Sequence, residues 1–276
     1  MKIRIILTYK GVSYFYNYIM KIIDCFIFYN EYNLLLMRFT ELYDIVDQFV
    51  IVEATSTHSG KEKELNFKNN LKLYEKFLDK VTYIIVNDMP NNANAWDNEN
   101  YQRACIDKGI KKLNLANEDI IMITDCDEIP NKNTLKLIKE NKIQISRDYI
   151  YGLDMDFYYY NFTCKQDIQW TKGKLLTLEK YNNSLMNNEK RLLENIRSMQ
   201  NKLIQNGGWH LSFFGNTDFI INKIKNFAHQ EHNTDACISD IENNVINNKC
   251  IFDKRKLKNI NIKDNNNLPE NYKIMI

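Results

Sequence analysis

The chain has 276 residues, of which 44% are hydrophobic and 26% charged, and its formal net charge is +2. This profile is typical of a globular protein with a substantial core, and it excludes a disordered chain and a strongly basic nucleic-acid-binding surface. No stretch reaches the length of a membrane span, and residues 1–23 lack the apolar core and cleavage site of a signal peptide. The six cysteines form no CxxC pair and no zinc-finger spacing, so we expect free thiols and a cytoplasmic protein.

The first half of the chain alternates apolar runs with helical patterns. Short apolar runs at residues 22–29, 49–52, 81–86 and 120–124 are typical of buried strands. Helices are predicted between them, at about residues 31–46, 71–78 and 99–113. This alternation predicts an α/β fold, a three-layer αβα sandwich with a mostly parallel central sheet.

Three acids follow the fourth predicted strand directly: Asp125, Asp127 and Glu128. In open α/β sheets, ligands bind beyond the carboxyl ends of the strands, so these acids stand where a ligand is expected. Carboxylates this close repel one another unless a cation joins them. A hard divalent ion that also contacts a substrate phosphate is one answer. A solvated acidic turn before a helix cap is the alternative.

A polar group interrupts the apolar stripe of the third predicted helix. Counting back from Ile106 and Ile110 places Glu99, Gln102 and Arg103 on the same stripe, at the helix end that lies beside the strand tips. Inward-facing charges need partners. Arg103 is therefore expected to contact a phosphate or to pair with a neighbouring acid.

In the second half, residues 148–162 alternate between two faces, as in a long strand. One face carries Asp154 and Asp156 among tyrosines, which suits carbohydrate binding and equally an ordinary half-exposed strand. A helix is predicted over residues 192–203, ending at the glycine pair 207–208, with an aromatic turn around His210 after it.

These patterns divide the chain into an N-terminal extension (1–21), one domain (22–258) and a loosely held polar tail (259–276). Two further histidines, His229 and His232, have a spacing that can bind zinc, although no other Cys or His nearby completes a tetrahedral set. The remaining histidine, His58, lies in a polar loop and is expected to be solvated.

Several segments together resemble glycosyltransferase family 17, in an order that covers about residues 22–233. The matching segments are 24–31, 38–44, 49–55, 101–103, 124–130, 207–215 and 229–231. The resemblance implies a GT-A-like fold, UDP-GlcNAc as donor, and a glycan or glycoprotein acceptor. It also implies inversion at the anomeric carbon and a β-linked product. Animal members are Golgi membrane proteins, and no membrane span is predicted here.

The resemblance also implies roles for individual residues. Asp125 and Asp127 would hold Mn²⁺ or Mg²⁺ against the diphosphate, with His210 as a further ligand of the metal or of a phosphate. The donor would be surrounded by five residues: Asp24, Asn30, Glu53, Gln102 and Arg103.

An inverting transfer needs a base that takes the proton of the acceptor hydroxyl. The sequence offers Glu231, Asp156 and Asp218, with Glu231 preferred. Two other functions remain open from the residues alone. The same acids could serve a metal-dependent phosphohydrolase, and the aromatic and acidic strand could belong to a non-catalytic carbohydrate-binding protein.

Overall fold

The computed structural model describes residues 2–9, 12–90, 94–186 and 192–276. Half of its central sheet consists of parallel strands: β3 (Ile22–Phe28), β4 (Gln48–Ala54), β5 (Val81–Val86) and β6 (Ile120–Asp125). Cys25 of β3 pairs with Val50 on one side and with Ile123 on the other. The four strands predicted from the apolar runs are therefore confirmed, within one or two residues at their ends.

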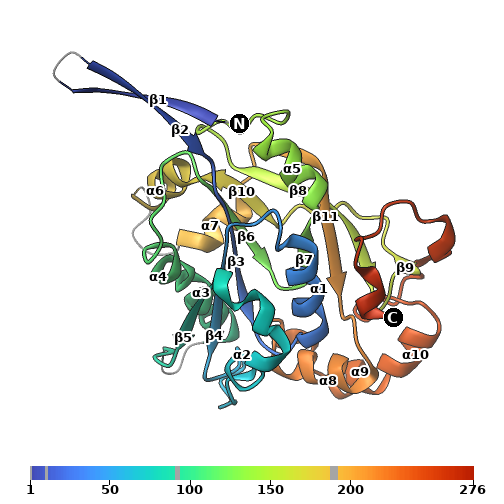
Figure 1. Ribbon diagram of the computed structural model, residues 1–276. Coiled ribbons are helices and arrows are strands. Elements are labelled where there is room, and N and C mark those ends of the chain that lie inside the picture. The colour runs from blue at the N-terminus through green and yellow to red at the C-terminus, as the bar shows by residue number, and fades with distance from the viewer. Residues whose placement is uncertain (1, 10–11, 91–93, 187–191) are drawn as a thin grey trace.

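The other half of the sheet is largely antiparallel. It contains β7 (Glu128–Pro130), β8 (Tyr151–Tyr159), β9 (Cys164–Lys165), β10 (Lys174–Thr177), β11 (Lys202–Ser212) and β12 (Lys258–Asn259). The ten-stranded sheet runs in the order β12-β9-β8-β10-β6-β3-β4-β5, and β11 pairs with both β8 and β7 (Figure 1). Only β11 and β8 are parallel in this half, so the sheet as a whole is mixed.

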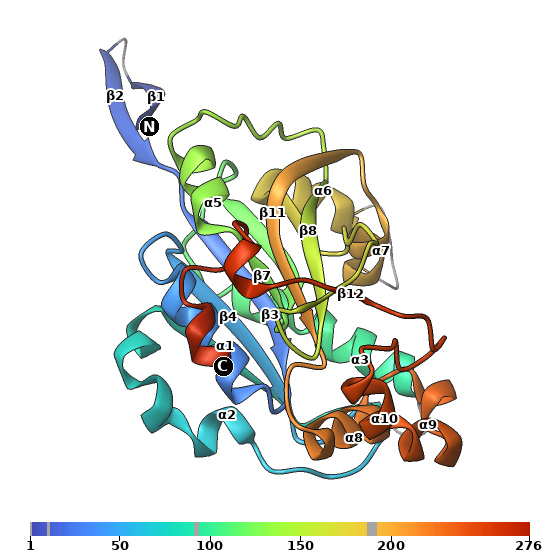
Figure 2. The ribbon, with the colours of Figure 1, turned by 90° about the vertical axis from the view of Figure 1, so that its right-hand side faces the viewer.

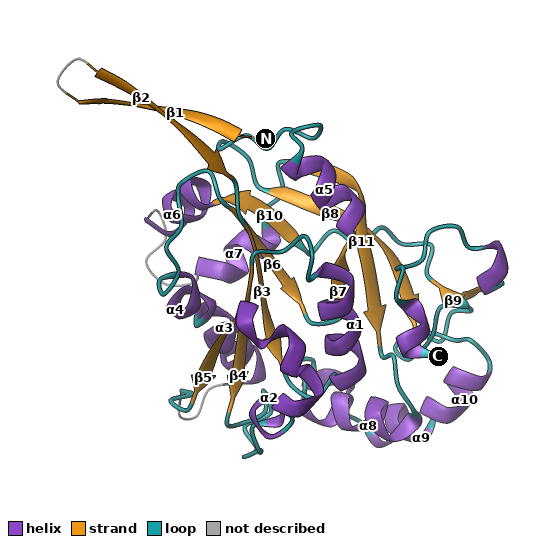
Figure 3. Ribbon diagram, viewed as in Figure 1, coloured by secondary structure: helices purple, strands orange, loops and turns teal. Residues whose placement is uncertain are grey.

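Helices cover both faces of the parallel half (Figure 3), which confirms the α/β class and the three layers. One face packs against α1 (Tyr32–Leu42), the 3₁₀ segment η1 (Leu71–Lys80) and α5 (Lys132–Lys139). The opposite face packs against α3 (Ala95–Ala104), α4 (Ile106–Ile110), α6 (Leu178–Met186) and α7 (Leu192–Ser198). Each face buries its own apolar cluster, as expected for strands with two apolar sides.

A third apolar cluster lies at the carboxyl edge of the sheet, where β8 meets a group of short helices. These are α8 (Thr217–Asn226), η2 (Gln230–His232), α9 (Asp235–Ser239) and α10 (Ile241–Ile246). The remaining short elements are α2 (Asn66–Asn69), η3 (Ile262–Asp264) and η4 (Tyr272–Met275). At the other end of the fold, β1 (Lys2–Tyr9) and β2 (Val12–Ile19) form a separate hairpin that projects from the body (Figure 1).

The helix predicted over residues 192–203 is shorter in the structure. It ends at Ser198, and β11 begins at Lys202, so the glycine pair lies inside a strand rather than in a helix stop. A Cβ atom on Gly207 would lie 2.6 Å from the backbone nitrogen of Asp154, and Gly208 has a φ of +144°. The glycines are required because β11 passes close to the backbones of β8 and β7, and not because a ligand approaches them.

Residues 259–276, predicted to be a loose tail, pack against α1 in the structure (Figure 2). The buried carboxylate of Glu41 accepts hydrogen bonds from the backbone N–H groups of Glu270 and Asn271. The Trp209 indole N–H donates to the carbonyl of Asn267 at 2.8 Å. Apolar side chains of the tail cover α1 and β11. They are scattered among Asn and Lys residues, and for that reason the sequence pattern did not indicate a packed segment.

All six cysteines are free, and five of them are buried. Among the helices in the described ranges, none has both the length and the apolar character needed to cross a bilayer.

Arg38 of α1 joins the helix layer to the carboxyl edge of the sheet. Its side chain is fully buried and donates two hydrogen bonds to the carboxylate of Asp24, at 2.8 and 2.6 Å. A further bond of 2.5 Å reaches the hydroxyl of Thr124. The same guanidinium also donates to three backbone carbonyls at the end of β6 and just after it, those of Asp125, Cys126 and Glu128. One side chain therefore determines the path of the acidic turn.

We expect Arg38→Met to lower the free energy of unfolding by about 3–5 kcal/mol, because it leaves the Asp24 carboxylate buried without its partner. Urea denaturation followed by circular dichroism measures this change. Lys142→Met, which removes an exposed ion pair with Glu140, is the control and should change stability little. Equal stability of the two variants would contradict the role assigned to Arg38.

Candidate active site

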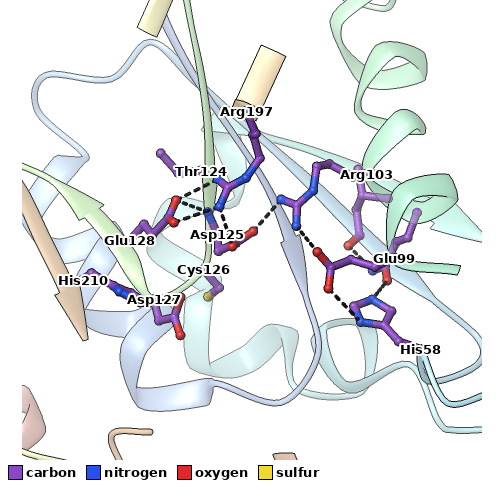
Figure 4. A network of polar contacts seen from close by, with 12 residues as sticks. His58, Glu99, Arg103, Thr124, Asp125, Cys126, Asp127, Glu128, Arg197 and His210 are labelled. Carbon is purple, nitrogen blue, oxygen red and sulfur yellow. Dashed lines mark hydrogen bonds and ion pairs between the residues drawn. The ribbon is translucent and has the colours of Figure 1, made fainter. Parts of the chain in front are cut away.

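The acidic turn at residues 125–128 forms one wall of a pocket at the carboxyl edge of β3 and β6 (Figure 4). The pocket has a volume of about 630 Å³, which falls in the range of small-molecule sites. Its walls come from the first strands, α3, α7, β8, β11 and α8, segments far apart in the sequence. The sequence predicts a ligand site at this edge of the sheet, and the structure has this pocket there.

Asp125 is held between two arginines. Arg103 donates to one carboxylate oxygen at 2.5 Å, and Arg197 of α7 donates to the other at 2.8 Å (Figure 4). Burial alone raises the pKa of Asp125, but the two guanidinium groups outweigh it and hold the pKa well below its usual range. Asp125 is therefore ionised at neutral pH. Arg103 was expected to contact either a phosphate or a neighbouring acid, and in the structure it pairs with the acid Asp125.

Glu128 lies behind the pocket wall and is fully buried. It accepts hydrogen bonds from Arg197 at 2.8 and 2.9 Å, from the Trp170 indole N–H at 2.8 Å and from the backbone N–H of Asp125 at 2.9 Å. With its oxygens engaged in this way, Glu128 positions Arg197 and the turn.

Asp127 lies on the other side of the turn and faces Lys223 and His210. The Lys223 ammonium donates to one carboxylate oxygen at 2.7 Å, and Nε2 of His210 lies 3.7 Å from the other. Burial raises the pKa of Asp127, but Lys223 and His210 reverse the effect, and the net pKa is lowered. The cations Arg103, Arg197 and Lys223 thus pair with Asp125, Asp127 and Glu128, and Arg103 also pairs with Glu99 at 2.7 Å.

His210 is fixed between two aromatic rings. Its imidazole stacks on Trp170, with ring centroids 4.0 Å apart, and on Phe157, with centroids 4.4 Å apart. Burial lowers its pKa, so the ring is neutral near pH 7. The buried Nδ1 atom has no hydrogen-bond partner among the described protein atoms.

These residues fit a divalent ion at Asp127 and His210. Two ligand atoms bound to one ion lie about 3.0–3.8 Å apart when each bond is about 2.1–2.2 Å long. The 3.7 Å between Asp127 Oδ1 and His210 Nε2 agrees with this spacing. The full predicted ligand set is not assembled, because Arg103 and Arg197 occupy both oxygens of Asp125. Within the described ranges, the ligand atoms of Asp125, Asp127 and His210 do not all lie within 4.8 Å of one another.

The predicted donor-binding residues divide into two groups. Gln102 and Arg103 line the pocket, and Gln102 contacts His58, whose Nε2 lies 2.9 Å from its side-chain oxygen. His58 is thus a pocket residue rather than a solvated one. Three others, Asp24, Asn30 and Glu53, do not line the pocket.

Each of those three residues nevertheless touches a neighbour of the site. Asp24 is fully buried against Arg38. Glu53 accepts a hydrogen bond from Lys63, a pocket residue, at 3.0 Å. Asn30 donates to Asn222 of α8 at 3.2 Å and precedes Glu31, which lines the pocket.

None of the three predicted bases lines the pocket. Asp156 points to the opposite face of β8, where it pairs with Lys165 at 2.8 Å and accepts from Asn267 at 3.0 Å. Asp218 lies at the start of α8. Glu231 lies near the rim, where its carboxylate contacts Nδ1 of His229, a pocket residue, at 2.6 Å.

The pocket contains its own carboxylate that the sequence analysis did not single out. Glu31 accepts two backbone N–H bonds, from Tyr29 and Asn30, each at 3.1 Å. The other pocket carboxylates, Glu99, Asp125 and Asp127, pair with cationic side chains, whereas no such pair is seen for Glu31 in the described part of the chain.

Comparison with known proteins identifies relatives by sequence. A family model described as "Glycosyltransferase family 17" matches residues 11–264. The chain is similar to the human and rat proteins named beta-1,4-mannosyl-glycoprotein 4-beta-N-acetylglucosaminyltransferase, each 33% identical over 116 residues. The matched stretch is 40% of this chain and 22% of each relative's length.

Comparison of structures gives more distant similarities. The glucosyl-3-phosphoglycerate synthase of Mycobacterium tuberculosis, solved with Mn²⁺, UDP and phosphoglyceric acid, has a TM-score of 0.38 and 8% identity, covering 71% of both chains. The galactosyltransferase LgtC, solved with donor and acceptor sugar analogues, has a TM-score of 0.33 and 14% identity. That alignment covers 66% of this chain and 67% of the other.

We expect Lys223→Met to tighten Mn²⁺ binding on the order of tenfold, because it removes an ammonium group that competes for the Asp127 carboxylate. Titration calorimetry with Mn²⁺ alone measures the affinity. Lys225→Met, an exposed lysine on the same helix, is the matched control and should leave the affinity unchanged. Weaker Mn²⁺ binding in Lys223→Met would contradict an ion site at Asp127.

Proposed function

The chain belongs to glycosyltransferase family 17, and on this premise we propose that it transfers GlcNAc from UDP-GlcNAc to a glycan or glycoprotein acceptor. The transfer is metal-dependent, inverts the anomeric centre and gives a β linkage. The names of the human and rat relatives support the choice of sugar.

The observation that carries this proposal is the cluster of charged side chains inside the pocket. Arg103 and Arg197 beside Asp125, and Lys223 beside Asp127, bring three cationic groups to the acidic turn at the carboxyl edge of the sheet. A nucleoside diphosphate carries the negative charge that such a cluster would bind, and arginine forks match phosphate oxygens. The phosphates would compete with Asp125 for the two arginines.

Asp127 and His210 would hold Mn²⁺ or Mg²⁺, and Asp125 would join them once the phosphates engage Arg103 and Arg197. The bound ion would neutralise charge on the leaving diphosphate. The chain's own part is to fix the backbone of the turn that carries the two aspartates, since Glu128 and Arg38 hold the turn from behind.

Aromatic side chains also line the pocket, beside the charged residues, and they offer apolar surface to a sugar ring or a base. They are Phe157, Tyr159, Trp170, Phe213 and Phe252. Gln102 and Arg103 contact the donor directly in this proposal. Asp24, Asn30 and Glu53 act from behind the pocket wall, through Arg38, Glu31 and Lys63.

We place the catalytic base at Glu31, because it is a pocket carboxylate for which the described ranges show no ion pair with a cationic side chain. Glu31 takes the proton of the acceptor hydroxyl as that oxygen attacks the anomeric carbon. The bond from this carbon to the diphosphate breaks on the opposite face, and its electron pair leaves with UDP. The configuration is therefore inverted.

A panel of nucleotide sugars incubated with a glycan mixture tests the donor. UDP-GlcNAc should be consumed with Mn²⁺ and not after chelation, and Asp127→Asn should reduce turnover by more than about 100-fold. Release of inorganic phosphate from simple esters without UDP-GlcNAc turnover would favour a phosphohydrolase. Glycan binding that survives chelation without any turnover would favour a carbohydrate-binding protein.

We expect Glu31→Gln to lower kcat by about 10²–10⁴-fold with little change in the KM for UDP-GlcNAc, as loss of a general base does. Glu231→Gln, the same change at the base preferred from the sequence, should lower kcat much less. Steady-state kinetics with saturating acceptor distinguish the two. The reverse order of effects would place the base at Glu231.

A further inference from the structure

A second group of metal-binding side chains lies at the rim of the pocket, in the turn that follows α8. His229, Glu231 and His232 each offer one ligand atom, and these atoms lie within 4.8 Å of one another. In the described part of the chain, this is the group of three His, Cys, Asp or Glu side chains whose ligand atoms lie this close together. It shares no residue with the acidic turn of the active site.

The geometry of η2 explains why the three side chains meet. Residues three apart in a 3₁₀ turn lie above one another, so His229 and His232 come to the same side. The sequence shows the His-x-x-His spacing but gives no reason to expect the intervening Glu231 on that side. In the structure its Oε1 lies 2.6 Å from Nδ1 of His229 and 3.9 Å from Nε2 of His232.

Aromatic neighbours hold both imidazole rings in place. The rings of Trp96 and His229 make an edge-to-face contact, with centroids 4.3 Å apart. His232 stacks on Phe252, with centroids 4.1 Å apart and planes 28° from parallel. Because the rings are already oriented, little side-chain freedom is lost when a ligand binds.

We propose that His229, Glu231 and His232 form a site for a divalent transition-metal ion of the zinc class. Two imidazoles and one carboxylate are a ligand set that zinc uses, with the fourth position left to water or substrate. Ligand atoms around a tetrahedral zinc lie about 3.4 Å apart. The present distances of 2.6 and 3.9 Å bracket this value, so small side-chain movements suffice. The ion takes the place of the proton shared by His229 and Glu231.

The two sites differ in the ions that they select. The acidic turn offers mainly carboxylate oxygens, which suit Mg²⁺ and Mn²⁺, whereas the rim site offers two nitrogens. His229 also lines the pocket, so an ion bound at this site would lie next to the cavity. A metal-bound Glu231 is not available as a base, in agreement with a base at Glu31.

Metal binding without any substrate tests this site. The Asp125→Asn, Asp127→Asn double variant removes the carboxylates of the first site and serves as the parent for titration with Zn²⁺ and, separately, Co²⁺. We expect one equivalent of Zn²⁺ and the intense visible absorption of tetrahedral Co²⁺. His229→Ala and His232→Ala should each weaken Zn²⁺ binding by more than about tenfold. Glu231→Gln should weaken it in the same direction.

Two control variants show whether Zn²⁺ binding is specific to this turn. His58→Ala deletes a histidine elsewhere in the pocket, and Cys237→Ser deletes a partly exposed thiol near the turn; both should bind Zn²⁺ as the parent does. Circular dichroism of the parent and of each variant checks that it is folded; we expect the single substitutions to leave the fold intact, because His229 and Glu231 are exposed and His232 is half-buried. No Zn²⁺ uptake by the parent, or unchanged affinity in both histidine variants, would overturn the proposal. The result does not depend on donor turnover, so it stands or falls separately from the proposed transferase activity.

Discussion

The interactions of the buried Arg38 guanidinium are those on which the geometry of the candidate site depends. This guanidinium satisfies the Asp24 carboxylate inside the sheet and three carbonyls at the end of β6 and just after it. A buried charge with this many partners tolerates few alternative backbone paths, because any other path leaves polar groups unpaired in a dry environment. Helix α1 therefore positions the acids of the turn, although none of these acids belongs to α1 itself.

Charge balance within the pocket follows from contacts between distant segments. Three acids within four residues would repel one another, and the sequence alone suggests a metal ion as the remedy. In the structure, protein cations supply the compensation: Arg197 lies 72 residues after Asp125, and Lys223 lies 96 residues after Asp127. Neither the arginine nor the lysine stands out in its own helix. Only the fold brings them to the turn, and for that reason the sequence analysis missed them.

The parts of the fold that sequence analysis predicted well share one property, namely that local pattern determines them. The strands beginning at Ile22 and Ile120 are continuous apolar runs between polar turns, and their layer order follows from alternation with helices. Strand β11 was missed because Gly207 and Gly208 suggest a helix stop, while their true cause is close packing against other strands. The same limit explains Asp156, whose strand was predicted but whose face the pattern left open between carbohydrate and solvent; in the structure this carboxylate contacts the C-terminal segment.

That C-terminal segment has a consequence for how the chain acquires its structure during synthesis. Residues 262–275 cover the outer side of α1, and Glu41 on that helix is satisfied by backbone groups of Glu270 and Asn271. Until these residues leave the ribosome, α1 lacks its outer packing and Glu41 lacks its partners. The helix that carries Arg38 thus becomes fully supported only after residues 262–275 have been synthesised, and a nascent chain can build its parallel strands before its acidic turn is secured.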